Sequence, residues 1–330
     1  MNKVLVLGSG SWGTALVKIL LEHSDTKVDW WVRSEETAEY IRTKGSNPKY
    51  LRSVKFDTSR INVSTNVQEL ISQNDIVLLV TPSAFVYDLI HPIPKEEFAN
   101  KTIISAVKGV IPQTLQIIAD YLMTDKEVKE EHFLVVTGPC HAEEVAQEKL
   151  SYLTVAGKSK KLRKKFAKAL RCNFINVTHT DDIYGTEITA VLKNVYSIAA
   201  GICHSLGYGD NFQAVLMSNA IREIKKFIKA YHPIKRDTNK SAYLGDLLVT
   251  GYSQYSRNRT FGAMLGKGYS VRSALMEMEM ISEGYYATES IHKLNEKYDV
   301  EMPILDFVYN IVYQKRNAKQ QAKLLTQCLN

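Results

Sequence analysis

The sequence lacks several features that would mark a specialised class of protein. Its four cysteines, Cys140, Cys172, Cys203 and Cys328, are far apart and form no CxxC pair, so neither a zinc site nor a redox motif is indicated. There is no run of about eighteen uncharged apolar residues, the length that would indicate an integral membrane segment. The first residues also lack the apolar run and cleavage site of a signal peptide. We therefore expect a cytoplasmic protein with reduced thiols and no metal.

Basic residues outnumber acidic ones, with 42 Lys and Arg against 35 Asp and Glu and a formal net charge of +7 over 330 residues. An excess of this sign suits a nucleic acid, a membrane surface or a phosphorylated small substrate. Much of it lies in residues 158–171, where Leu162, Phe166, Ala169 and Leu170 recur at helical spacing. That pattern favours an amphipathic helix with a solvated basic face. No nucleic-acid-binding module accompanies it, so we expect no nucleic-acid partner.

The two halves of the chain have different patterns. Short β-branched runs alternate with helical patterns in the first half, which predicts a mostly parallel sheet with helices on both faces. The later residues show a helical i, i+3, i+4, i+7 pattern. We expect an α/β fold in which a Rossmann-type domain (1–182) precedes an all-α domain (183–330). The expected strands are 3–7, 28–32, 75–80, 102–106, 133–137, 153–156 and 174–178, and the expected later helices are 186–206, 212–230, 271–283 and 304–325.

A glycine-rich segment, GSGSWG at residues 8–13, follows the first expected strand and opens a helix. In this strand–turn–helix setting Gly8 would allow the tight turn and Gly10 the close approach of a pyrophosphate. Gly13 would permit the contact between helix and strand. The N-terminus of the helix would present backbone N–H groups to the phosphates. The segment predicts a dinucleotide site.

The end of the second expected strand bears on which dinucleotide is used. An enzyme strict for NAD often has an acidic residue there, whereas this chain has Arg33 followed by Ser34. A guanidinium beside a hydroxyl suits a 2′-phosphate, although Arg33 would also suit a surface position stacked on adenine. We favour NADPH over NADH.

Polar segments also follow later strand ends and lie on the later helices. Lys108 and the run 138–142 fall beyond strand carboxyl ends, where open α/β sheets bind ligands. Lys193 lies beside the apolar stripe of its helix, and a lysine at such a position is usually solvated. Asp246 would orient and charge-stabilise such a lysine. A dense polar run follows at Ser256, Arg257 and Asn258, which suits phosphate or hydroxyl oxygens, with a capped interhelix loop as the alternative.

Taken together, these segments resemble the bacterial NAD(P)-dependent glycerol-3-phosphate dehydrogenases. The matching stretches keep the order and approximate spacing of that family over almost the whole chain. They are GSGSWGTAL (8–16), NPKYL (47–51), VTPS (80–83), AVKG (106–109), GPCHAEEV (138–145), LKNV (192–195), GYGDN (207–211), GDLLVT (245–250), SRNRTFG (256–262) and EG (283–284). The resemblance implies interconversion of dihydroxyacetone phosphate and sn-glycerol 3-phosphate, which supplies the glycerophospholipid backbone in lipid biosynthesis.

The resemblance also implies roles for individual residues. Lys193 would be the proton donor and acceptor, with Lys108 and Asp246 positioning it. Cofactor contacts are expected from Gly8, Gly10, Ser11, Trp12, Gly13, Arg33, Tyr50, Lys108, Ala142, Arg257, Ile281 and Glu283. Substrate contacts are expected from Lys108, Gly138, Cys140, Lys193, Asp246, Ser256, Arg257 and Asn258.

The chain departs from the family pattern at a few positions. Cys140 is commonly a serine and His141 an aromatic residue, so a weaker thiol donor replaces a hydroxyl. The run Ser218-Asn219-Ala220 stands where Thr-Arg-Gly is usual, and Gly251 where cysteine is frequent. Two alternatives remain: a dehydrogenase of hydroxyacyl-CoA or sugar acids, and a non-enzymatic NAD(P) sensor. The oligomeric state is open, with a homodimer as one hypothesis.

Overall fold

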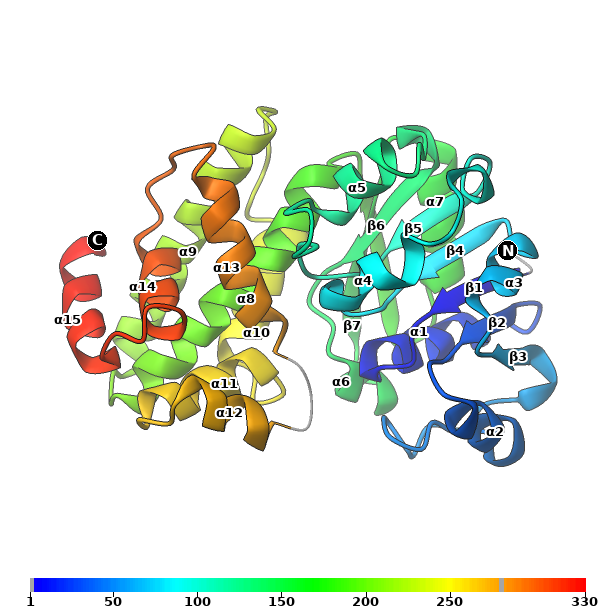
Figure 1. The fold of residues 1–330 in the computed structure, drawn as a ribbon, viewed down its shortest axis with the longest axis horizontal. Helices are drawn as coiled ribbons and strands as arrows, with labels where there is room; N and C mark the ends of the chain where they lie inside the picture. Colours follow the sequence, from blue (N-terminus) through cyan, green and yellow to red (C-terminus); the bar gives the residue numbers. More distant parts are fainter. Residues whose placement is uncertain (1–2, 279–281) are drawn as a thin grey trace. The chain divides into compact units, whose positions relative to one another are not determined.

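The computed structural model describes residues 3–278 and 282–330, and the chain divides into two compact units. The sheet unit comprises Met1–Val107 and Ile118–Ile183, and the helical unit comprises Lys108–Ile117 and Tyr184–Asn330 (Figure 1). The short segment Lys108–Ile117 thus packs with the helical unit although it begins only three residues after the end of a strand of the sheet. The expected domain boundary between residues 182 and 183 stays a prediction.

The sheet unit is built on one eight-stranded sheet with the order β3-β2-β1-β4-β5-β6-β7-β8. Every neighbouring pair is parallel except β6 and β7, which are antiparallel. The strands are β1 (Lys3–Leu7), β2 (Lys27–Trp31), β3 (Ile61–Ser64), β4 (Ile76–Leu79), β5 (Thr102–Ser105), β6 (Phe133–Thr137), β7 (Ser151–Ala156) and β8 (Ile175–Thr180). The predicted α/β class with a mostly parallel sheet is confirmed, and β3 is the strand that the sequence did not indicate.

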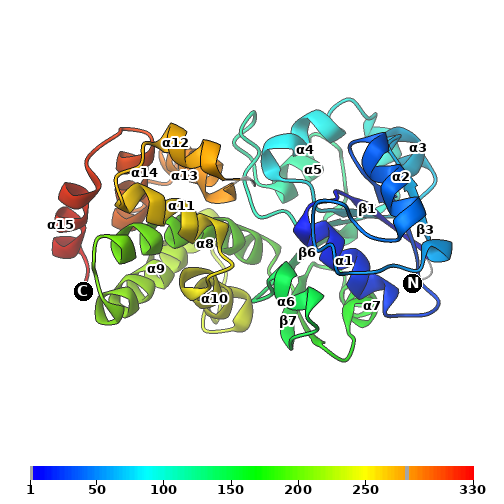
Figure 2. The same cartoon turned by 90° about the horizontal axis from the view of Figure 1, so that it is seen from below.

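Helices cover both faces of this sheet. In Figure 2, α4 and α5 lie on one side of the strands and α6 and α7 on the other. On the α7 side, Val4 and Val6 of β1 share a buried cluster with Leu16 and Phe166, so alternate strand residues and the helices form one core. The helices are α1 (Ser11–Leu21), α2 (Glu35–Lys44), α3 (Val67–Ser72), α4 (Ser83–Ile90), α5 (Ile118–Thr124), α6 (Ala142–Ala146) and α7 (Lys160–Leu170), with short 3₁₀ turns at Thr58–Arg60, Lys95–Glu97 and Glu130–His132.

The described part of the helical unit contains helices and no named strand (Figure 1). They are α8 (Ile183–Ser205), α9 (Asp210–Tyr231), the π-helical segment Ser241–Gly245, α10 (Asp246–Tyr252), α11 (Arg257–Gly266), α12 (Val271–Glu277), α13 (Glu283–Asn295), α14 (Pro303–Val312) and α15 (Ala318–Cys328). The single helix expected over 304–325 was wrong: Lys315 has a φ of 54°, and the Asn317 side chain caps a new helix by accepting from the Gln320 N–H. The helix expected over 271–283 also ends early, at Glu277.

Two glycines bring α8 and α11 into very close contact. A Cβ on Gly201 would overlap the Arg259 carbonyl, and one on Gly262 would overlap the Ile198 carbonyl. Only glycine permits this approach, which places the polar residues of α8 against those at the start of α11. No helix in the described ranges has the length and apolar character needed to cross a bilayer.

Candidate active site

The glycine-rich loop of the sheet unit joins β1 to α1, and its glycines have different surroundings. A Cβ on Gly13 would overlap the Gly8 carbonyl, and one on Gly8, whose φ is 134°, would come within 3.0 Å of the Val80 and Thr81 backbone. These two glycines are therefore required by packing within the protein. A Cβ on Gly10 would meet nothing within 4 Å, so the loop is open at this residue. Space beside backbone at a helix N-terminus fits a pyrophosphate.

Beyond the end of β2, Arg33 is exposed and Ser34 caps α2 by accepting from the Thr37 N–H at 3.3 Å. The guanidinium of Arg33 is thus presented to solvent next to a capped helix start. Tyr50 is half-buried, and its backbone N–H donates to Asn47 Oδ1 at 3.1 Å. Both residues lie in the sheet unit with the glycine-rich loop.

Further expected contacts lie elsewhere in the sheet unit. Ser11 begins α1, and the half-buried Trp12 packs against the core cluster. Gly138 follows β6 with a φ of 126°, and a Cβ there would lie 2.7 Å from the Tyr152 carbonyl. Cys140 is buried, and Ala142 is the first residue of α6. The sheet unit therefore contains the expected residues up to position 107 and those at 138–142.

In the helical unit, Lys193 of α8 forms a buried ion pair with Asp246. The ammonium donates to Asp246 Oδ1, and the two residues are 4% and 0% exposed. Asp246 begins α10 directly after the π-helical segment, and segments of this kind frequently occur at functional sites. Lys193 is therefore a buried, paired cation, and the solvated position that helix geometry alone favoured is wrong.

This environment perturbs the titration of Lys193. Burial lowers the pKa of Lys193 to about 8, because removing an ammonium from water favours the neutral amine. The carboxylate of Asp246 acts in the opposite direction, and the positive charge of Lys108 lowers the pKa further. A lysine that titrates near neutral pH can both give and take a proton under ordinary conditions.

A chain of side-chain amides lies beside this pair. Asn194 donates from Nδ2 to the Lys108 carbonyl at 3.1 Å, and Asn258 Nδ2 donates to Asn194 Oδ1 at 2.9 Å. Asn258 Oδ1 accepts from the Ser282 hydroxyl at 2.8 Å and the Gly284 N–H at 2.9 Å. The network joins α8, the start of α11, the start of α13 and the segment that carries Lys108. Within the described residues, the second N–H of the Asn258 amide has no acceptor, so it is available to a ligand.

The hydroxyl of Ser256 is used within the protein. It accepts from the Arg259 N–H as the cap of α11 and lies 2.7 Å from the Ser197 hydroxyl. Because Ser197 donates its single proton to the Thr250 carbonyl at 2.8 Å, Ser256 must donate to Ser197. Arg257, the half-buried first residue of α11, follows directly. The Ser256 hydroxyl has therefore already used its one proton, so it can contact a substrate only as an acceptor.

The structure groups the expected residues into two sets. The helical unit contains Lys108, Lys193, Asp246, Ser256, Arg257, Asn258 and Glu283, the last as the first residue of α13. Ile281 lies outside the described residues. Sequence reasoning assigned no role to Asn194, Ser197 or Asn47. Two of them could have been suspected from their position in the sequence, because Asn194 follows Lys193 and Asn47 opens the segment that contains Tyr50.

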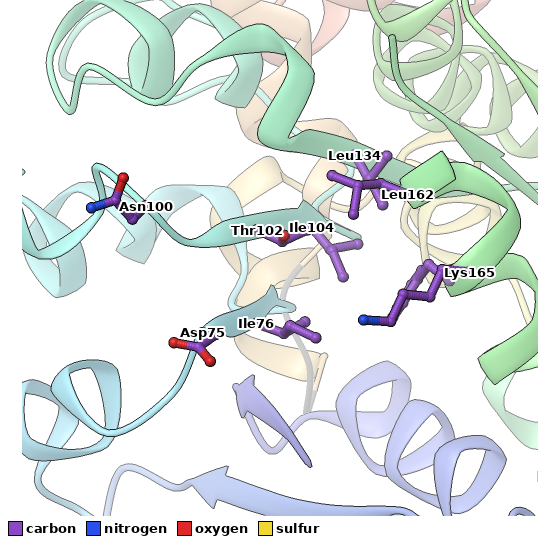
Figure 3. Close-up of a pocket in the computed structure, with 9 residues that line it drawn as sticks. Asp75, Ile76, Asn100, Thr102, Ile104, Leu134, Leu162 and Lys165 are labelled. Carbon is purple, nitrogen blue, oxygen red and sulfur yellow. The ribbon is translucent and has the colours of Figure 1, made fainter. Parts of the chain in front are cut away.

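A separate cavity of about 190 Å³ lies near the amino ends of β4 and β5 (Figure 3). It is lined by Ile76 and Thr102, the first residues of β4 and β5, and by Lys165 of α7. The glycine-rich loop follows the carboxyl end of β1, so this cavity is not the dinucleotide site. Among the described residues, no three His, Cys, Asp or Glu side chains are grouped as metal ligands.

Comparison with known proteins connects these features to one family. The model of the NAD-dependent glycerol-3-phosphate dehydrogenase N-terminus matches residues 3–163, and that of the C-terminus matches residues 182–323. A glycerol-3-phosphate dehydrogenase [NAD(P)+] of Staphylococcus haemolyticus is 31% identical over 98% of this chain and 97% of its own length. One from Bacillus thuringiensis is 34% identical over 97% of this chain and 94% of its own length.

A solved structure has the same fold throughout. The crystal structure of glycerol-3-phosphate dehydrogenase from Coxiella burnetii superimposes with a TM-score of 0.91 at 27% identity, covering 98% of both chains. The two family models together, and relatives of near-equal length, thus match most of the chain. The chain therefore belongs to the NAD-dependent glycerol-3-phosphate dehydrogenase family.

Proposed function

We propose that this protein interconverts dihydroxyacetone phosphate and sn-glycerol 3-phosphate with NAD(P)H. The observation that carries the proposal is the buried Lys193–Asp246 pair with the charge of Lys108 nearby, in a chain that belongs to this family. Such a pair is expensive to bury for stability alone, since apolar residues of similar size often serve as well. A perturbed lysine with specific charged neighbours is typical of a functional site.

The residues of the sheet unit fit a nicotinamide dinucleotide. The open side of Gly10 at the start of α1 suits the pyrophosphate, and the exposed guanidinium of Arg33 suits the ribose end. When bound, the reduced nicotinamide supplies a hydride to the ketone carbon. Gly8, Gly13, Ser11, Trp12, Tyr50 and Ala142 complete the proposed cofactor contacts in this unit, and Lys108, Arg257, Ile281 and Glu283 supply the remainder.

The helical unit supplies the proton. In the reducing direction, the Lys193 ammonium gives a proton to the carbonyl oxygen as negative charge develops on it. Asp246 holds the ammonium by accepting its hydrogen bond. Burial, with the charge of Lys108 adding to it, keeps the pKa of Lys193 low enough for the proton to leave. In the oxidising direction the neutral Lys193 amine accepts a proton from the alcohol. Arg257 and the remaining N–H of Asn258 bind phosphate or hydroxyl oxygens of the substrate, with Gly138, Cys140 and Ser256 as the other proposed substrate contacts.

Three finer points belong to the same proposal. NADPH is favoured over NADH because Arg33 replaces the acidic residue expected of an enzyme strict for NAD. The reaction takes place in the cytoplasm, where it provides glycerol 3-phosphate for phospholipid synthesis. A homodimer is the hypothesis for its assembly.

A substrate panel tests the proposal. NADPH and NADH oxidation are followed at 340 nm with dihydroxyacetone phosphate, a 3-ketoacyl-CoA and a keto sugar acid. We expect cofactor oxidation with dihydroxyacetone phosphate and with neither of the other two ketones. Tight NADPH binding without turnover of any ketone would instead support an NAD(P)-sensing protein, and turnover of another ketone would reassign the substrate.

A further inference from the structure

The side chain of Asn47 has an unusually complete set of hydrogen bonds. It is 1% exposed and donates from Nδ2 to the Ser9 carbonyl and to Thr14 Oγ1, each at 2.9 Å. Its Oδ1 accepts from the backbone N–H groups of Lys49 at 2.9 Å and Tyr50 at 3.1 Å. Both amide protons and both carbonyl lone pairs are therefore used. A single buried side chain thus joins the glycine-rich loop to the turn that carries Tyr50.

These bonds set the direction of the loop's peptide groups. In a trans peptide the C=O of one residue and the N–H of the next point in opposite directions. Because Asn47 holds the Ser9 carbonyl toward the protein, the Gly10 N–H points away from it. The Gly10 carbonyl accepts from the N–H and the hydroxyl of Thr14, both at 2.9 Å, so the Ser11 N–H of the same peptide group points away from Thr14. Asn47 in turn fixes the Thr14 hydroxyl.

The loop also has room for a ligand beside Gly10. Gly10 is the glycine of this loop at which an added Cβ would meet nothing within 4 Å. Donors that are held in a fixed direction at a helix N-terminus bind an anion without first reorganising the loop. A loop free to rotate its peptide groups would lose part of that affinity.

We propose that Asn47 is a cofactor-positioning residue: its buried amide orients the donors of the glycine-rich loop and the turn that carries Tyr50 at the same time. Asn47 touches no reacting atom, so it controls dinucleotide affinity and not the chemical step. The proposal rests on the proposed NAD(P)H-dependent function.

The test uses variants that separate donation from acceptance. Asn47→Asp keeps the shape and the acceptor for the Lys49 and Tyr50 N–H groups but cannot donate to the Ser9 carbonyl. Asn47→Ala removes both functions. The matched control is Asn74→Ala, because Asn74 is also buried in the sheet unit and donates to the Leu70 carbonyl at 2.8 Å and Asp29 at 2.6 Å. Dissociation constants for NADPH, NADH, ADP-ribose and AMP are measured by titration, together with kcat and melting temperature.

We expect both Asn47 variants to bind NADPH, NADH and ADP-ribose at least tenfold more weakly, by the same factor for all three. Binding of AMP, which has no pyrophosphate, and kcat at saturating cofactor should change little. Asn74→Ala should lower the melting temperature but leave every dissociation constant unchanged. If the Asn47 variants lose thermal stability while their cofactor affinity stays normal, the proposal is wrong and Asn47 is only structural.

A milder pair of variants covers the case in which the Asn47 variants do not fold. Thr14→Val removes the hydroxyl that accepts from Asn47, and Thr14→Ser retains it. Weaker NADPH binding in Thr14→Val than in Thr14→Ser supports the positioning role of Asn47, and equal binding overturns it. Failure of the unaltered protein to bind NADPH at all would contradict the proposed function. That result differs from normal NADPH binding by the Asn47 variants, which would contradict only the positioning role of Asn47.

Discussion

Removal of Lys193 should affect both catalysis and stability, and the two effects are separable. Lys193→Met keeps most of the side-chain volume but leaves the carboxylate of Asp246, which is 0% exposed, without this cation. Removing one member of a buried ion pair costs about 3–5 kcal/mol of unfolding free energy. A chain of this length should then melt on the order of ten degrees lower.

The catalytic effect follows from the loss of the proton donor. Turnover of dihydroxyacetone phosphate should fall by about 10²–10⁴, the usual contribution of a general acid. The affinity for NADPH should stay near normal, because the glycine-rich loop lies in the sheet unit. Turnover is measured at 340 nm, NADPH affinity by fluorescence titration and stability by calorimetry.

A double variant distinguishes the two effects. Lys193→Met with Asp246→Asn no longer buries an unpaired charge, so it should regain most of the lost stability while remaining inactive. Asp246→Asn alone removes a carboxylate that raises the pKa of Lys193, so that pKa should fall below about 8. The reduction rate should then decline at a lower pH than in the unaltered protein. If the double variant recovered turnover together with stability, Lys193 would be a structural residue and the proton would come from elsewhere.

Three further predictions concern other parts of the molecule. Arg33→Ala should weaken NADPH binding by about 1.5–3 kcal/mol, roughly tenfold or more, and NADH binding far less, and equal losses in titrations would remove the 2′-phosphate contact. Arg257→Lys should raise KM for dihydroxyacetone phosphate at saturating NADPH, because a point charge cannot reproduce the planar fork, and an unchanged KM and kcat would place Arg257 outside the site. Glu223 accepts from the Ile304 and Leu305 N–H groups, but its burial raises its pKa from 4.5 to about 8. The folded state therefore binds more protons than the unfolded state between these values, so stability should fall as pH rises from about 4.5 to 8. Glu223→Gln should flatten that fall in melting temperature, and an identical pH profile would refute the assignment.

The strands in the interior of the sheet could be predicted because their hydrophobic residues are nearly continuous. Every residue of β6 is buried, and the expected range 133–137 is the observed one. The edge strand β3 was missed because only one of its four residues, Val63, is buried. Its apolar residues Ile61 and Val63 do alternate with polar ones, but over only four positions, which is too short a pattern to stand out, and its pairing with β2 supplies the structure.

The candidate site was predictable in its residue types but not in its burial. Helix geometry alone placed Lys193 on a flank, where a lysine is usually solvated. Burial of this lysine depends on Asp246, 53 residues away in sequence, and on contacts of α8 with other helices. Long-range hydrogen bonds of this kind, including that between Asn47 and Ser9 across 38 residues, leave no periodic signal in the sequence.

Transfer of a labelled hydride tests the central claim most directly. The protein is incubated with dihydroxyacetone phosphate and NADPH deuterated at C4, with each C4 epimer used in turn. The product is identified by mass spectrometry and by a stereospecific assay for sn-glycerol 3-phosphate. The account predicts that one epimer gives sn-glycerol 3-phosphate carrying a single deuterium at C2, with no label lost to water. No glycerol 3-phosphate from NADPH or NADH, or product without deuterium from both epimers, would contradict it.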